Sequence, residues 1–184
     1  MERYRLHKFY NLKNWSLNLN PPEALYRSHT PHDRPVKGSR TAWGGVLRFD
    51  GSAHIGRGSK IIVATNALME LGDNFAISAS STIVSYKKII FGRDIQFSWD
   101  CLVMDSDTHN IYNEEGLISN PPSALKFGNK VWICNGCMIL KGTEIPSNCV
   151  IGAHSVVSGH KFESNSIIVG SPAKIVKKIK DWHI

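Results

Sequence analysis

The chain has 184 residues, of which 42% are hydrophobic and 20% are charged, as expected of a soluble protein with one domain and a sizeable core. The N-terminus has no apolar core segment and no run of about 18 apolar residues occurs, which argues against a signal peptide and a membrane span and predicts a cytoplasmic protein. The formal net charge of +7 favours phosphate-bearing ligands, but alone it does not choose between nucleic acid, an anionic membrane and a phosphorylated cofactor.

Residues 1–40 form the first predicted unit and lack the repeat that follows. They hold eight Lys or Arg residues against three acidic ones, among aromatic and leucine side chains, and Pro21 and Pro22 would end any amphipathic helix there. We interpret the segment as a cap over the open end of a solenoid. The alternative is a docking surface for a membrane or for a lipid-linked acceptor.

A period of six residues organises the second unit, residues 41–170. The period is loose up to residue 69, firmer from Leu71 onward, and strongest between residues 127 and 157. Its large apolar positions in that stretch are Phe127, Ile133, Ile139, Ile145, Ile151 and Val157. A helix of 3.6 residues per turn would spread such a repeat around its surface, so the pattern predicts a solenoid of short strands. Three sixes make one triangular coil, so we expect residues about 18 apart to stack.

The four cysteines fit this repeat better than they fit a metal or redox site. Cys101, Cys137 and Cys149 occupy its small inward positions, which predicts buried thiols in a reducing compartment. Cys134 and Cys137 form a C-x-x-C pair, but the repeat points their side chains in different directions and the chain has no second pair. We therefore expect neither disulfides nor a bound metal.

Residues 104–126 interrupt the repeat and form a predicted loop. Four acidic residues and no Lys or Arg lie from Asp105 to Glu115, and Pro121 and Pro122 prevent regular strand pairing. Long polar loops that leave a compact repeat are usually functional or disordered. The third unit, residues 171–184, is rich in lysine and is expected to form a short basic helix.

His109 lies in this loop, two residues after Asp107 and four after Asp105. Histidine is the side chain best suited to accept a proton near neutral pH, and a nearby carboxylate can orient its ring. A zinc site between subunits, as in the gamma-class carbonic anhydrases, would need two histidines close together in one repeat and a third one coil away. Only His109 stands in a suitable position, so the sequence favours proton transfer over a metal site.

Several motifs together resemble one known family. They are Asp105-Ser-Asp-Thr-His109, Phe127-Gly-Asn-Lys-Val-Trp-Ile133, Ile139-Leu-Lys-Gly142, Val150-Ile-Gly-Ala153 and Gly170-Ser-Pro-Ala-Lys174. This combination resembles the left-handed β-helix hexapeptide-repeat acyltransferases, in particular the sugar O-acetyltransferases that act on galactosides, maltose, capsule or lipopolysaccharide. The resemblance covers roughly residues 45–180 and implies an all-β solenoid wound as a left-handed parallel β-helix. The left hand comes from the family, because crossover rules alone favour the right hand.

The resemblance also implies roles for individual residues. His109 would be the general base that deprotonates an acceptor hydroxyl for direct attack on acetyl-CoA, and Asp107, or else Asp105, would orient His109 or the sugar. The resemblance implies that six residues contact acetyl-CoA. Trp132 would lie beside the CoA arm, and the pantetheine channel would be lined by Asn135, Ala153 and Ser158. The phosphates would be bound by Lys174 and Lys177, with Lys178 beside them. The chain departs from the family at His154 and at Gly159, where a basic residue is common.

Members of this family are trimers with active sites between subunits, so the resemblance implies a homotrimer and a saccharide acceptor. N-acetylation of an amino sugar on the same fold is an open alternative, as is carbonic anhydrase-like activity. A third alternative is a non-catalytic basic solenoid that binds nucleic acid or a membrane. Against nucleic acid, the positive charge lies at the two ends of the chain, and no aromatic-basic motif for stacking bases stands out.

Overall fold

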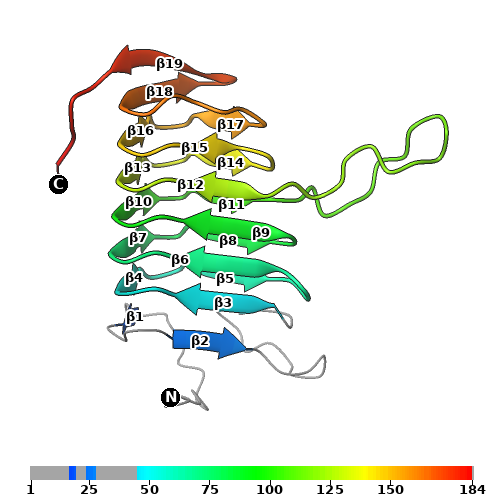
Figure 1. Ribbon diagram of the computed structural model, residues 1–184, viewed down its shortest axis with the longest axis horizontal. Coiled ribbons are helices and arrows are strands. Elements are labelled where there is room, and N and C mark those ends of the chain that lie inside the picture. Colours follow the sequence, from blue (N-terminus) through cyan, green and yellow to red (C-terminus); the bar gives the residue numbers. More distant parts are fainter. Residues whose placement is uncertain (1–16, 20–23, 28–44, 184) are drawn as a thin grey trace.

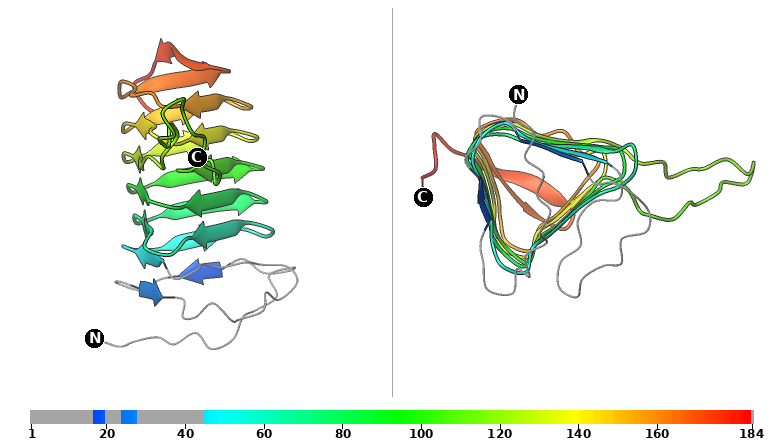
Figure 2. Two further views of the ribbon diagram at one scale, coloured as in Figure 1. Left: turned by 90° about the vertical axis from the view of Figure 1, so that its right-hand side faces the viewer. Right: turned by 90° about the horizontal axis from the view of Figure 1, so that it is seen from below.

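The computed structural model describes residues 17–19, 24–27 and 45–183. These residues form an all-β solenoid that winds through three sheets around a triangular cross-section (Figures 1 and 2). The predicted fold class is confirmed. Most of the predicted cap, residues 1–40, lies outside the described residues, so its role stays a prediction. The described ranges contain no helix that is long and apolar enough to cross a membrane.

The strands are short, mostly three to five residues each. Their bounds are β1 (Leu17–Leu19), β2 (Ala24–Arg27), β3 (Val46–Phe49), β4 (Ala53–Ile55), β5 (Lys60–Val63), β6 (Leu68–Leu71), β7 (Phe75–Ala79), β8 (Thr82–Ser85), β9 (Lys88–Phe91), β10 (Ile95–Trp99), β11 (Leu102–Met104), β12 (Leu125–Phe127), β13 (Val131–Ile133), β14 (Met138–Leu140), β15 (Glu144–Ile145), β16 (Cys149–Ile151), β17 (Val156–Ser158), β18 (Ser166–Gly170) and β19 (Ala173–Lys178).

Each strand of a coil pairs in parallel with the strand of the next coil in the same sheet. Sheet A has the order β1-β4-β7-β10-β13-β16-β18-β19, sheet B the order β15-β12-β9-β6-β3-β2, and sheet C the order β17-β14-β11-β8-β5. In the most regular coils Val131 pairs with Cys149 and Met138 with Val156, which confirms the expected spacing of 18 residues there. Side chains that alternate inward and outward therefore form columns along the solenoid.

The longer coils carry their extra residues at one corner, where the chain passes from sheet C to sheet B. The other two corners keep a step of six residues between inward side chains, as from Phe91 to Phe97. The step from sheet C to sheet B takes eight residues from Ile83 to Phe91 and twenty-four from Val103 to Phe127. We call this the C–B corner. The insertion at residues 105–124 is thus the largest of several additions at this corner, and it projects far from the body (Figures 1 and 2).

Aromatic and aliphatic side chains fill the centre of the solenoid. Phe75, Phe91, Phe97 and Phe127 are at most 2% exposed, and the rings of Phe91 and Phe127 stack with centroids 4.5 Å apart. Isoleucines at the inward positions of neighbouring coils continue these columns, and most of them are fully buried. This dry centre fixes the register of every strand, because a slip by one residue would turn the apolar set outward.

The cysteines are free thiols, as the repeat predicts. Cys101, Cys137 and Cys149 are buried, whereas Cys134 is half-buried at the corner between sheets A and C, which we call the A–C corner. The hydrogen bond between the Cys101 and Cys137 thiols lowers the pKa of Cys101 to about 7 and raises the pKa of Cys137. Within the described ranges, no group of three or more His, Cys, Asp or Glu side chains could hold a metal ion.

The predicted C-terminal helix is wrong. Residues Ala173–Lys178 form β19, which turns back and pairs antiparallel with β18. Without β19, the outer edge of β18 would expose unpaired backbone groups, and the β-branched Ile175 and Val176 favour a strand at that edge. At the opposite end of the solenoid, β1 and β2 pair antiparallel with β4 and β3. The described strands therefore cover both ends of the solenoid in the same way.

Candidate active site

Asp105 lies at the base of the insertion and is fully buried. Its carboxylate accepts hydrogen bonds from Ser85 Oγ at 2.9 Å and from the backbone N–H groups of Tyr86, Lys87 and Lys88 at 2.6, 2.9 and 2.7 Å. These donors form the lengthened C–B corner of the preceding coil. A buried carboxylate needs such donors, and in return it satisfies the backbone of that corner. Asp105 therefore supports the fold beneath the insertion. Its carboxylate binds Ser85 and the backbone of this corner, whereas the sequence predicted a contact with His109.

Asp107 is held at the mouth of the insertion. Its Oδ2 lies 2.5 Å from Lys141 Nζ and accepts a hydrogen bond from Asn120 Nδ2 at 2.8 Å. The same Asn120 amide donates to the carbonyl oxygen of His109 at 2.9 Å, and Lys141 Nζ donates to the carbonyl oxygen of Asn120 at 3.0 Å. Lys141 and Asn120 hold the pKa of the Asp107 carboxyl below its ordinary value. We call Asp107, Asn120 and Lys141 the clamp, because they join both arms of the insertion to the end of β14.

His109 lies just beyond the clamp, with an exposed side chain. Its Nδ1 lies 3.0 Å from Thr108 Oγ1, within hydrogen-bonding distance. Thr108 has a φ of 65°, and its N–H donates to Ser106 Oγ at 3.0 Å, so a tight turn presents the histidine. The clamp thus fixes the backbone of His109, and Thr108 provides a partner for its ring.

The outer part of the insertion carries several apolar side chains. Tyr112 and Ile118 form an antiparallel bridge that narrows it into a hairpin. Four large side chains there are between 47% and 62% exposed: Ile111, Tyr112, Leu117 and Ile118. Because such a group of exposed apolar side chains is unfavourable in water, we expect a partner or a ligand to cover it.

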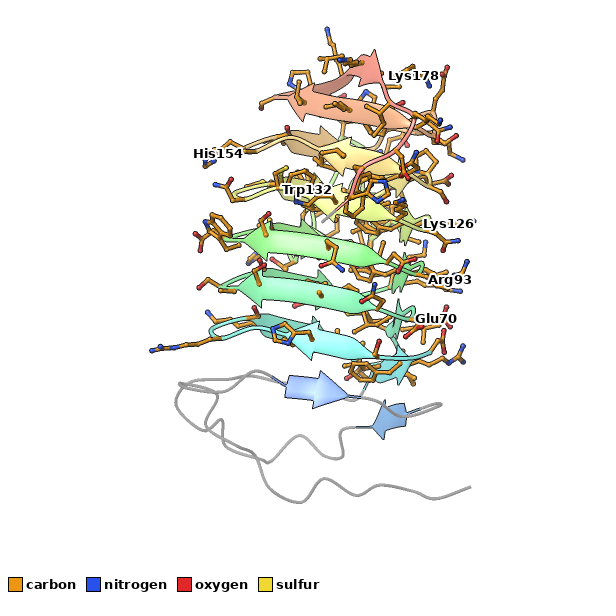
Figure 3. The ribbon with its side chains drawn as sticks, turned by 90° about the vertical axis from the view of Figure 1, so that its left-hand side faces the viewer. Glu70, Arg93, Lys126, Trp132, His154 and Lys178 are labelled. Atoms are coloured by element: carbon orange, nitrogen blue, oxygen red, sulfur yellow. The ribbon has the colours of Figure 1, made fainter. Side chains whose placement is uncertain are left out.

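Trp132 lies on the outer face of sheet A, and the C-terminal residues run down across this face (Figure 3). Its Nε1 donates to Ser98 Oγ at 3.3 Å, and the Trp182 ring contacts it with centroids 6.0 Å apart. Trp182 Nε1 donates to the carbonyl oxygen of Lys130 at 3.1 Å, and Lys130 Nζ lies 2.5 Å from Asp181 Oδ1. These contacts enclose a cleft of about 220 Å³, which we call the Trp132–Trp182 cleft, lined by Ser78, Gln96, Phe97, Ser98, Trp132, Trp182 and His183.

The other predicted contacts to acetyl-CoA lie at different places on the solenoid. Asn135 and Ala153 meet at the A–C corner in successive coils, where the N–H of His154 donates to the carbonyl oxygen of Asn135 at 3.0 Å. Ser158 ends β17, beside the C–B corner. Lys174 and Lys177 are exposed on β19. The structure thus brings Asn135 and Ala153 together. Trp132 belongs to sheet A, whereas the insertion projects from the corner between the other two sheets (Figure 2).

Sequence reasoning missed three residues that the structure places at these sites. Lys141 belongs to the Ile139-Leu-Lys-Gly142 motif, but its partner Asp107 is 34 residues away. Asn120 lies in a polar run, and its bonds depend on how the insertion folds back. Trp182 lies 52 residues after Lys130, whose carbonyl oxygen accepts a hydrogen bond from the indole N–H of Trp182. Each of the three depends on a long-range contact that no local pattern reports.

No protein-family profile matches the chain. It is 28% identical to the putative lipopolysaccharide biosynthesis O-acetyl transferase WbbJ of Escherichia coli strain K12, over 72% of this chain and 74% of that protein. It is 32% identical to a probable acetyltransferase of Mycobacterium tuberculosis over 67% of this chain, and this match spans 41% of that protein. A solved galactoside acetyltransferase in complex with coenzyme A superposes with a TM-score of 0.56 and 22% identity, covering 65% of this chain and 60% of that one.

These relatives are named as acetyltransferases, and the shared fold matches the predicted hexapeptide-repeat acyltransferase family. The likeness of fold establishes the left-handed parallel β-helix, so the predicted fold class is confirmed. The relatives that are named as acetyltransferases support the predicted acyltransferase activity. An acyltransferase of this kind must bring an acyl donor, an acceptor and a proton acceptor together. His109 is exposed on the insertion, and Asn120 anchors its backbone carbonyl oxygen.

Proposed function

We propose that this protein transfers an acetyl group from acetyl-CoA to a hydroxyl of a saccharide, with surface polysaccharide as the product. The observation that carries the proposal is the clamped insertion, which holds His109 exposed at a fixed point of an acyltransferase solenoid. Two relatives support it: one is a putative O-acetyl transferase of lipopolysaccharide biosynthesis and another is a galactoside O-acetyltransferase.

In the proposed reaction, His109 takes the proton of the acceptor hydroxyl as the oxygen attacks the thioester carbonyl of acetyl-CoA. In the tautomer whose Nδ1–H donates to Thr108 Oγ1, Nε2 has the free lone pair and receives this proton. A backbone N–H stabilises the tetrahedral oxyanion. The carbon–sulfur bond then breaks, and the proton passes from His109 to the departing thiolate. Both substrates meet in one site, so no acyl-enzyme forms.

The positions of the predicted contacts are compatible with a bound acetyl-CoA. The A–C corner offers Asn135 and Ala153 to the pantetheine arm, with Trp132 three residues before Asn135, and Ser158 would contact the arm further along. Lys174 and Lys177 are exposed cations at the end of the solenoid and would bind the phosphates. Lys178 is less suited, because its ammonium lies 2.6 Å from Glu163.

A homotrimer would complete this site. Most outward side chains of sheet C are apolar. Half-buried on one copy are Val84, Leu102, Met104, Leu140 and Val156, and the polar outward residues are Lys60, Thr82 and Ser158. Sheet B instead presents charged residues outward, such as Arg48, Glu70 and Lys126. Packing sheet C and the apolar insertion against neighbouring copies would bury both surfaces and bring His109 of one copy to the acetyl-CoA positions of the next.

The proposal is tested by incubating the purified protein with acetyl-CoA and matched panels of hydroxy sugars and amino sugars. Release of CoA thiol is recorded, and the site of acetylation is found by mass spectrometry of the products. Acetyl esters on hydroxy sugars are expected. Amides formed only on amino sugars would replace the proposal with N-acetylation. Binding to nucleic acid or to anionic vesicles without binding of CoA would replace it with the non-catalytic alternative.

A further inference from the structure

The Trp132–Trp182 cleft has the chemistry of a saccharide site, and this inference rests on the proposed function. Trp132 and Trp182 form two adjoining aromatic walls, with centroids 6.0 Å apart and planes tilted by 39°. Ligand pockets in proteins are mostly apolar with a few polar groups that fix orientation, and this cleft follows that rule. Its volume of about 220 Å³ suits one ring rather than an extended chain.

Both indole N–H groups of the cleft are already occupied by protein acceptors. Trp132 Nε1 donates to Ser98 Oγ, and Trp182 Nε1 donates to the carbonyl oxygen of Lys130. A ligand can therefore use only those parts of the ring faces that the Lys130 ammonium over Trp182 and the contact between the two rings leave open. The negative face of an aromatic ring attracts weakly positive groups, such as the C–H bonds on the flat face of a pyranose.

The floor of the cleft provides neutral hydrogen-bonding groups. Ser98 accepts a hydrogen bond from Trp132 and keeps its own O–H to donate, whereas Ser78 donates to the carbonyl oxygen of Phe97 at 3.1 Å and keeps acceptor capacity. The side-chain amide of Gln96 can both donate and accept. Sugar hydroxyls also both donate and accept. Apart from His183, which lies 3.2 Å from the Asp181 carboxylate, the lining residues carry no ionisable side chain, so the lining suits an uncharged ring.

The segment that carries Trp182 is anchored, so this wall of the cleft is built into the fold. Ile179 N–H donates to the carbonyl oxygen of Asn165 at 2.9 Å, and Asn148 Nδ2 donates to the carbonyl oxygen of Lys180 at 3.0 Å. Asp181 then pairs with Lys130, whose ammonium lies 6.0 Å from the centre of the Trp182 ring. We propose that the Trp132–Trp182 cleft binds a neutral pyranose ring of the acceptor saccharide, with Trp182 as a specificity-determining residue.

The test measures binding directly, without acetyl-CoA and without turnover. Saturation-transfer NMR records contact of methyl β-D-galactopyranoside and of methyl α-D-glucopyranoside with the full-length protein, and sorbitol serves as an open-chain polyol control. Binding in the millimolar range is expected for at least one glycoside and not for sorbitol. Trp182→Ala should weaken that binding about tenfold, and Trp182→Phe should restore most of it. Tyr86→Ala, which removes an exposed aromatic ring outside the cleft, should leave it unchanged.

Three outcomes would overturn the inference. One is that neither glycoside binds, and another is that Trp182→Ala leaves the affinity for the glycoside unchanged in a protein that remains folded by circular dichroism. The third is that Trp182→Ala weakens binding of acetyl-CoA and not of the glycoside, since the cleft would then belong to the acyl donor. Failure of the proposed acetyl transfer is a separate result, because a glycoside can bind the cleft whether or not it is acetylated.

Discussion

The carboxylate of Asp107 lies 2.5 Å from the ammonium of Lys141, so the aspartate nearest to His109 in the sequence is paired with a lysine at the end of β14. Asn120 joins this pair to the carbonyl oxygen of His109. In the proposed reaction, Asp107 would position the histidine through its backbone and would not hold the imidazole ring.

Breaking this pair should therefore slow acetyl transfer more than it destabilises the protein. Asp107→Ala and Lys141→Ala should each lower kcat between about tenfold and a hundredfold, because small displacements of a catalytic group are costly. The side chains of Lys141 and Asp107 are 23% and 45% exposed, so water screens the pair in part and the loss of folding free energy should be about 0.5 kcal/mol. The double variant should be no slower than either single variant. Initial rates and thermal unfolding measure both quantities.

The control for these variants is Lys161→Ala, which breaks an exposed pair with Glu144 at 2.9 Å that includes no clamp residue and should leave kcat unchanged. Additive losses from the two clamp substitutions would contradict the role given to the pair.

The pH dependence gives a second check. Because the pKa of Asp107 is lowered, the pair is complete above the ordinary value of 3.8 and is lost only as the pH falls through the lowered pKa. Asp107→Asn should thus reduce the rate by a constant factor between about pH 5 and 8.

Asp105 should matter for stability in a way that Asp107 does not. Asp105→Asn replaces one acceptor oxygen by an amide that faces buried backbone donors, and it removes the charge that strengthens their hydrogen bonds. We expect the free energy of unfolding to fall by about 3 kcal/mol, against about 0.5 kcal/mol or less for Asp107→Asn. Urea denaturation of both variants provides the comparison. Equal losses would show that the buried carboxylate does not stabilise the C–B corner.

The lysines of β19 should act on the phosphates of acetyl-CoA. Lys174→Gln and Lys177→Gln should each raise KM for acetyl-CoA about threefold to fivefold, the size of one exposed charge contact. The same substitutions should leave KM for S-acetyl-pantetheine, which lacks the nucleotide phosphates, unchanged. Lys178→Gln is the matched control, because Lys178 pairs with Glu163. An equal rise in KM for both donors would place the two lysines outside the phosphate site.

The apolar outer face of sheet C should hold the subunits together. Leu102→Glu puts a charge on this face without changing the buried Val103 beside it, so it should dissociate a trimer while each subunit stays folded. Lys126→Glu on the outer face of sheet B is the control and should leave the assembly intact. Light scattering after size-exclusion chromatography gives the mass. A monomeric wild-type protein, or a Leu102→Glu variant that remains trimeric, would argue against this interface.

The fold could be predicted because its repeat is local: the period from Phe127 to Val157 specifies strands, corners and stacking together. The end of the chain could not be predicted in the same way. Lysines at 174, 177 and 178 permit a helix, and only the exposed edge of β18 makes Ile175 and Val176 part of a strand.

The candidate site was only partly predictable, for a related reason. His109 could be found because the repeat breaks around it. The partners of Asp105 could not, since the backbone groups it binds lie 17 to 19 residues earlier, at a corner whose two additional residues matter only once the coils are stacked. The contact of Trp182 with Trp132 likewise requires the chain to fold back across sheet A.

The most direct measurement is the rate of acetyl transfer from acetyl-CoA to a hydroxy sugar by the His109→Ala variant at saturating concentrations of both substrates. Because the side chain is exposed, the variant should keep its thermal stability and its affinity for acetyl-CoA. Its kcat should fall by a factor between about a hundred and ten thousand, the usual contribution of a general base. A kcat within about twofold of the wild-type value would contradict the account, because the clamped insertion would then hold no catalytic base.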